Sequence, residues 1–186
     1  MKTGLLTLGT AALIAIAAVS GFAAQTATKP APPAAGAAPS PAPELSQLAY
    51  FDGDWSCSGQ ANAGPAGPAH ATEAKVHVKR DLGGFWYMGR YEEKKTAENP
   101  HPVVFAWTWG FDRTAKAFTQ DGFDNFGMHA HETAPGWQNA TLVFANSGSR
   151  DTFTKKSDSE LEHQGEVQAQ GKWIATDHET CKRTGK

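Results

Sequence analysis

Alternating aromatic residues constrain the fold of this 186-residue chain more than any other feature of its sequence. In residues 103–111, Phe105, Trp107, Trp109 and Phe111 occupy every second position, and smaller residues stand between them. Because the side chains of a β-strand point alternately to its two faces, this period of two predicts a strand with one aromatic face. A helical period is found only in residues 44–51, where one or two turns are expected.

The same alternation continues from Leu45 to Arg183, with turn residues about every ten positions. Six Trp, three Tyr and nine of the ten Phe lie in this part of the chain, against only twelve Leu, Ile and Val, a composition that favours strands. We therefore expect an all-β fold, a sandwich or a barrel. Of the two, we favour a single antiparallel β-barrel of about nine or ten strands. The expected strands are residues 54–62, 72–82, 85–94, 103–111, 117–123, 126–132, 138–145, 150–156, 160–168 and 171–183.

A Gly-Gly pair at positions 83 and 84 predicts a two-residue hairpin turn. The register that follows places Val78 opposite Gly89 and Arg80 opposite Tyr87 on an apolar face, and puts Trp86 and Met88 outside. A charged residue on a buried face needs a partner or a bound anion. Arg80 is thus either a polar anchor for a ligand carboxylate or phosphate, or a rim residue that reaches solvent.

The aromatic face of residues 103–111 extends into the next strand if residues 113–116 form a turn, because Phe118 and Gln120 then join it. Two interpretations remain open for these rings. They line an apolar ligand cavity with a few polar groups, or they pack a closed core. In the first case Tyr87, Phe105, Trp107, Trp109 and Phe118 contact the ligand, and Arg80 or Gln120 anchors its polar part.

The two cysteines lie near opposite ends of the strand-rich region, and an even number of cysteines in an exported chain favours a disulfide between Cys57 and Cys181. If they face each other on the first and last strands of a closed barrel, Trp55 lies opposite Arg183. A cation–π contact there contributes about 0.5–2 kcal/mol. A disulfide that closes a loop of about 125 residues contributes on the order of 4–5 kcal/mol in the chain-entropy model.

The N-terminal residues have the composition of a targeting segment. Residues 1–24 hold one basic residue, an apolar run and small residues at the end, which predicts a secretory signal peptide cleaved near Ala23 or Ala24. An uncleaved anchor is the alternative. Residues 25–44 are rich in Ala and Pro and predict a disordered linker before a domain at residues 45–183. We expect an exported protein, periplasmic or secreted, with no membrane span after cleavage.

Several short motifs resemble a known family. The sequence Gly53-Asp54-Trp55 on the first strand, with Arg183 on the last, resembles the lipocalin and calycin pattern, in which such a tryptophan packs under an arginine. The resemblance is closer to the secreted domain of unknown function family 1579, through Gly83-Gly84 followed by aromatics and through Gly110-Phe111-Asp112. It implies a lipocalin-like, calycin-type barrel without an established activity. No Thr-Asp-Tyr motif of true lipocalins is present in the middle of the chain, so no specific lipocalin ligand is transferred.

A His-x-His pair, His129 and His131, is the candidate metal site. Two histidines at this spacing on a strand point to the same face and could share a metal ion or a haem, with a third ligand from His163, His178 or Asp121. The register of the hairpin that follows is ambiguous, so the sequence does not decide whether this face points inward.

The sequence carries no motif of an enzyme or of nucleic-acid binding. It lacks a Gly-x-Ser-x-Gly elbow, a Gly-rich phosphate loop and a Cys-x-x-Cys pair, so neither an enzyme nor a cofactor is expected. A formal net charge of −2 without a basic stripe argues against a nucleic-acid partner. We expect an exported protein that binds a small apolar or amphiphilic ligand. The alternatives are an envelope structural or interaction protein with a solid core, contacting partners through Trp86 and Met88, and a metal- or haem-binding protein; the oligomeric state is left open.

Overall fold

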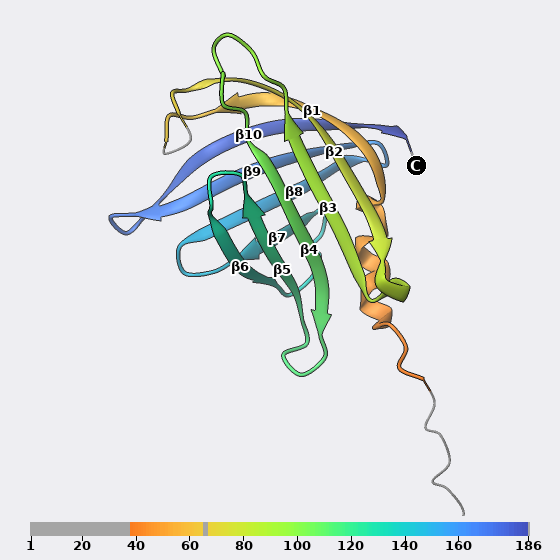
Figure 1. Ribbon diagram of the computed structural model, residues 1–186. Helices are drawn as coiled ribbons and strands as arrows, with labels where there is room; N and C mark the ends of the chain where they lie inside the picture. The colour runs from red at the N-terminus through yellow and green to blue at the C-terminus, as the bar shows by residue number, and fades with distance from the viewer. Residues whose placement is uncertain (1–37, 65–66, 186) are drawn as a thin grey trace, which may run out of the picture. The chain divides into compact units, whose positions relative to one another are not determined.

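The computed structural model describes residues 38–64 and 67–185 (Figure 1). The predicted signal peptide, residues 1–24, and residues 25–37 of the predicted linker lie outside the described residues. Among the residues that the structure describes, no helix is long and apolar enough to cross a lipid bilayer.

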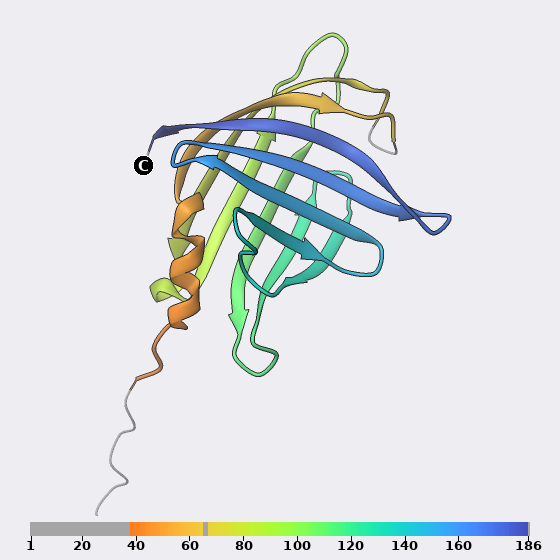
Figure 2. The ribbon, with the colours of Figure 1, turned by 180° about the vertical axis from the view of Figure 1, so that it is seen from behind.

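Ten antiparallel strands form a closed barrel (Figures 1 and 2), which confirms the predicted all-β barrel. Each strand pairs with its neighbours in sequence, and β10 returns to pair with β1. Closure pairs every strand on both sides, although β6 and β7 are joined by a single residue pair, Thr133 with Ala145. The strands are β1 (Gly53–Ala61), β2 (His70–Asp81), β3 (Trp86–Glu93), β4 (Val104–Asp112), β5 (Ala117–Asp124), β6 (His129–Ala134), β7 (Thr141–Ala145), β8 (Ser149–Ser157), β9 (Glu160–Ala169) and β10 (Lys172–Gly185).

A 3-10 helix, η1 (Pro43–Phe51), precedes β1 at one end of the barrel (Figure 2), called here the helix end. The opposite end of the barrel, called here the far end, contains the turns at residues 94–103, 125–128 and 170–171. Leu45, Leu48 and Phe51 of η1 are buried in the barrel core. Ala42, directly before η1, is buried as well.

The strand register predicted from the turns agrees with the structure. In the β2–β3 hairpin, Arg80 lies opposite Tyr87, with the short 3-10 turn η2 (Leu82–Gly84) between the strands. In the β4–β5 hairpin, Trp109 lies opposite Gln120. The predicted start of β6 at residue 126 is wrong. The Asp124 carboxylate accepts hydrogen bonds from the backbone N–H groups of residues 126 and 128, which turns residues 125–128 into a loop.

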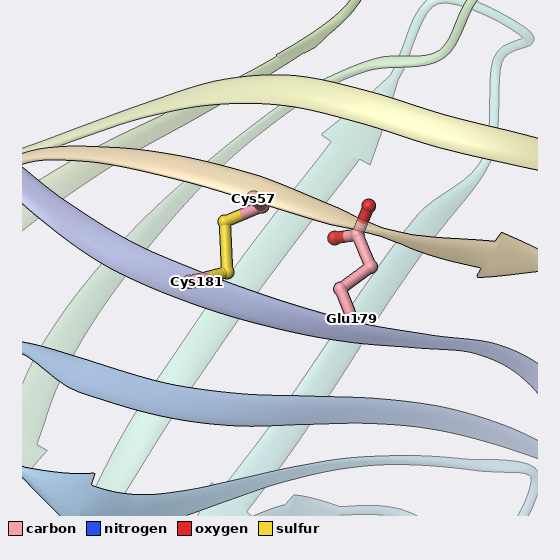
Figure 3. A group of neighbouring side chains, drawn as sticks. All are labelled: Cys57, Glu179 and Cys181. Carbon is pink, nitrogen blue, oxygen red and sulfur yellow. A yellow bond between two sulfur atoms is a disulfide. The ribbon is translucent and has the colours of Figure 1, made fainter.

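The predicted seam between the first and last strands is confirmed. Cys57 and Cys181 are paired residues of β1 and β10 and form a disulfide (Figure 3). Two residues from the cysteines along each strand, Trp55 of β1 lies opposite Arg183 of β10. The guanidinium of Arg183 is 4.1 Å from the centroid of the Trp55 ring. The same guanidinium donates hydrogen bonds to the backbone carbonyls of Tyr50, in the last turn of η1, and of Asp52, directly after it, so the seam and the helix are connected.

Candidate functional site

The barrel interior consists of two layers, and the layer at the helix end is an aromatic core. Tyr87, Trp109, Phe118 and Phe144 are almost completely buried there. Trp109 stacks parallel to Phe144 with 5.6 Å between ring centroids, and the ring of Phe51 from η1 lies 4.8 Å from Trp109. These rings fill the space between the strands, so the helix end of the barrel is a packed core.

The second layer lies between the aromatic core and the far end, and its inward-facing side chains are mostly polar or ionisable. We call it the acidic layer. Its members come from five strands of the barrel: Gln120 (β5), Glu132 (β6), Asp151 (β8), His163 (β9), and Asp177 and Glu179 (β10).

Gln120 connects the aromatic core to the acidic layer. Its Oε1 atom accepts a 2.6 Å hydrogen bond from Nε1 of Trp109. Its Nε2 atom donates to Oε2 of Glu132 at 2.9 Å and to Oδ2 of Asp151 at 2.7 Å. The amide thus holds two carboxyl groups side by side, and the Ser149 hydroxyl donates to the other oxygen of Glu132.

His163 lies between two carboxylates of the acidic layer. Its Nε2 atom is 3.3 Å from Oδ1 of Asp151, and its Nδ1 atom is 3.0 Å from Oδ2 of Asp177. The ring rests on the aromatic core, with 4.9 Å between the centroids of His163 and Phe153. Asp177 fits there because the facing residue on β9 is Gly165, where a Cβ atom would come within 2.4 Å of Oδ1 of Asp177.

Glu179 is almost completely buried and lies beside the disulfide (Figure 3). The Tyr91 hydroxyl donates to its Oε1 atom at 3.0 Å. One carboxylate oxygen and the sulfurs of Cys57 and Cys181 lie within 4.8 Å of one another. Since both sulfurs are bonded to each other, they cannot act as thiolate ligands, and this group is not a metal site.

Burial and neighbouring charges shift the pKa values of the acidic layer in opposite directions. Burial and the Asp151 carboxylate raise the pKa of Glu132 to about 7. Burial also raises the pKa of Glu179. For His163 burial acts to lower the pKa, but the hydrogen bonds and charges of Asp151 and Asp177 outweigh it and hold the pKa well above its usual value. For Asp177 burial acts to raise the pKa, but the paired His163 outweighs it and lowers the pKa.

The acidic layer is surrounded by strands, yet solvent reaches it. The side chains of His163, Asp151 and Asp177 keep 20%, 26% and 29% of their surface exposed although all three face inward. The aromatic residues at the helix end, Tyr87, Trp109, Phe118 and Phe144, are closed to solvent. The far half of the interior is therefore open to solvent, whereas the helix end is not.

Comparison with known proteins places the chain in a family without an assigned activity. A family model described as "Protein of unknown function (DUF1579)" matches residues 40–184. The chain belongs to the DUF1579 family. Among solved structures, the chain is similar to Rv2717c from M. tuberculosis, with a TM-score of 0.61 and 13% identity over 78% of this chain and 99% of that one. This likeness concerns the fold alone, and no curated protein matches the sequence.

In the DUF1579 barrel, the predicted ligand-contacting residues are divided between the two layers. Tyr87, Trp109 and Phe118 belong to the packed core. Phe105 and Trp107 lie nearer the far end, with ring centroids 5.7 Å apart. The two rings cover the inward-facing glycines of neighbouring strands, where added Cβ atoms would come within 2.2 Å of them.

The predicted polar anchors also separate. Gln120 is buried at the centre of the interior, as the register indicated. Arg80 is exposed, and its Nε atom donates to the carbonyl of Gly84 at 3.0 Å. Of the two interpretations given for Arg80, the structure shows the rim residue, so Arg80 adds no positive charge to the interior of this DUF1579 protein.

His129 and His131 lie on the outer face of β6, where both are exposed. Nδ1 of His131 is 2.7 Å from Oδ1 of Asp121, and Nε2 of His129 is 4.0 Å from the same oxygen. Within residues 38–64 and 67–185, these side chains are not part of a group of three ligand atoms spaced for one metal ion. The next residue along β6, Glu132, is buried on the opposite, inward face.

Trp86 and Met88 occupy the outer face, as the hairpin register predicted. The ring of Trp86 lies flat over Gly110, where a Cβ atom would meet it at 2.4 Å. More than a third of its surface remains exposed, and Met88 is half-buried.

Sequence reasoning missed most of the acidic layer, although one signal was available. The disulfide places Cys181 on the inner face, and a period of two then places Glu179 on that face as well. The same step along β8 from the inward-facing Phe153 leads to Asp151. A row of ionisable residues on an inner face was therefore readable in part once these two strands were assigned.

Proposed function

We propose that this protein binds a small amphiphilic molecule in the far half of the barrel. The polar group of the ligand contacts the acidic layer, and its apolar part lies against the rings of Phe105 and Trp107. The observation that carries the proposal is the combination of inward-facing ionisable side chains and solvent access to them.

Inward-facing ionisable side chains do not help to stabilise a barrel that has only a structural role. Burying an ionised group costs several kcal/mol unless it is paired, and apolar replacements of similar size are often as stable or more so. The helix end of this barrel follows that rule with a packed aromatic core. The far half departs from it, which is typical of binding sites, where a few polar groups are placed for recognition at a cost in stability.

We place this binding outside the cytoplasm. The disulfide between Cys57 and Cys181 supports this, because such bonds persist in oxidising compartments, and the predicted signal peptide agrees with it. The proposed role is therefore that of an exported binding protein.

Native mass spectrometry of the protein purified from its own host tests the proposal. We expect a retained small-molecule mass that is lost in Trp107→Ala, at the inner wall, and kept in Trp86→Ala, at the outer face. A clean unliganded mass, together with unchanged tryptophan emission across a panel of amphiphiles, would show that the barrel does not bind such molecules.

A further inference from the structure

The acidic layer also indicates the charge of the ligand. We propose that the ligand is an organic cation, a protonated primary amine with an apolar body, whose ammonium group lies among the carboxylates of the acidic layer. This inference rests on the proposed function, because it specifies the chemistry of the molecule bound at the same site.

The first argument is the balance of charge. Four carboxyl groups belong to the acidic layer, and within the described residues His163 is the only basic side chain that forms a salt bridge with any of them. Even when Glu132 and Glu179 carry protons, the carboxylates of Asp151 and Asp177 face a single imidazolium. The layer therefore keeps a negative charge that a monocation compensates, while a ligand carboxylate would be repelled.

The second argument is an unpaired donor on the same inner surface. Trp107 is 7% exposed, and its Nε1 atom is buried without a hydrogen-bond partner among the described residues. Buried indole N–H groups normally find an acceptor. An ammonium group cannot accept from this donor, so the ligand needs a separate acceptor atom, such as a hydroxyl or ether oxygen, on its apolar body. The stacked rings of Phe105 and Trp107 offer π faces that attract the cationic group itself.

The spacing of the carboxylates favours an organic cation over a metal ion. A metal ion needs several ligand atoms close to one point, and in the part of the chain that the structure describes no three members of the acidic layer have ligand atoms within 4.8 Å of one another. Both nitrogens of His163 already face carboxylates. An ammonium group donates three hydrogen bonds in different directions and suits acceptors that are spread over several strands.

Three probes of similar shape test the sign of the charge. Calorimetric titrations of the full chain at pH 7.5 compare 2-phenylethylamine, 2-phenylethanol and 3-phenylpropanoate, which are cationic, neutral and anionic. We expect the amine to bind at least about tenfold more tightly than the alcohol. We expect no measurable binding of the carboxylate, which the acidic layer would repel.

Two substitutions locate the binding. Asp177→Asn keeps a hydrogen-bond acceptor for His163 but removes one negative charge, and we expect it to weaken binding of the amine about tenfold. Asp121→Asn removes a carboxylate from the outer face of β5 and serves as the matched control with unchanged affinity. Should Asp177→Asn not fold, Asp151→Asn provides the same comparison from β8.

The outcomes separate this inference from the proposed function. If the alcohol or the carboxylate binds as tightly as the amine, the inference of a cationic ligand is wrong. The proposed function, binding of a small amphiphilic molecule, would still stand. An Asp177-dependent site that prefers Zn²⁺ or Ca²⁺ over the amine would overturn it in favour of a metal. If none of the three probes binds and native mass spectrometry shows no retained mass, the proposed function itself fails.

Discussion

Glu132 shows how a single residue acquires an unusual role through its neighbours. Its carboxyl group lies beside that of Asp151 and is held there by hydrogen bonds from Gln120 and Ser149. Two carboxylates so close cannot both ionise at little cost, so a proton remains on Glu132 up to near neutral pH. The amide of Gln120 accepts from Trp109 and therefore points its two donor hydrogens at the pair.

This arrangement predicts a barrel that is more stable in mild acid than in base. The pKa of Glu132 is about 7 in the folded protein against an ordinary 4.5, so its contribution to stability falls by about 3 kcal/mol as the pH rises through that interval. The pKa of His163 is raised as well, so its contribution is complete below 6.5 and is lost as the pH rises through the folded-state value. The pKa of Asp177 is lowered, so its contribution is lost only as the pH falls below 3.8.

Calorimetric melting at several pH values checks this expectation. The melting temperature should fall between pH 5.5 and pH 8.5, and Glu132→Gln should flatten the decrease, because an amide keeps the shape of the side chain without titrating. A variant with the same slope as the unaltered protein would show that Glu132 does not hold its proton.

Gly165 is the second residue on which the acidic layer depends. We expect Gly165→Ala to displace Asp177, because the added Cβ would lie 2.4 Å from its Oδ1 atom, and to destabilise the fold by about 1–3 kcal/mol in urea denaturation. Titration of His163 by NMR should give a lower pKa in this variant. Gly148→Ala is the matched control, since its Cβ would meet only Asn146 at 3.6 Å.

At the scale of elements, the seam between β1 and β10 is strengthened by the disulfide. Replacing both Cys57 and Cys181 by Ser should lower the free energy of unfolding by about 4–5 kcal/mol, since the disulfide joins residues 124 positions apart. Guanidinium denaturation with and without a reductant measures this. The reductant should shift the curve of the unaltered protein and leave that of the double variant in place.

Most strand pairings could be predicted from the sequence because their turns are short and regular. The turns at residues 82–85 and 113–116 fixed the register of two hairpins, and the cysteine pair fixed the seam. The β9–β10 hairpin is different. Its register shifts between Ala175 and Asp177, where β10 carries a bulge.

That bulge explains why the cross-strand partner of His163 was not predicted. Counting back from the 170–171 turn without it places His163 opposite His178. With the extra residue, His163 lies opposite Glu179, and Asp177 lies opposite Gly165. A shift of one residue in register moves every side chain of a strand to the other face. No residue in this stretch is of a type that predicts the bulge. The face of His129 and His131 was undetermined for a related reason, because the loop after β6 left its register open.

At the scale of the whole molecule, the two interior layers separate stability from recognition. Leu48 of η1 lies in the aromatic core at the helix end, away from the acidic layer. We expect Leu48→Ala to lower the free energy of unfolding by about 2–5 kcal/mol without changing affinity for the amine probe. Gln47→Ala, an exposed neighbour on the same helix, should change neither quantity, and parallel denaturation and titration of both variants check this.

The pairing of β1 with β10 also determines when the interior can form. Asp177 and Glu179 belong to the last strand, so they join Glu132 and Asp151 only after the final residues of the chain have entered the barrel. The charge repulsion that these two carboxyl groups add is therefore absent from any partly folded form that lacks β10. It opposes only the last step of folding, which the disulfide then makes hard to reverse.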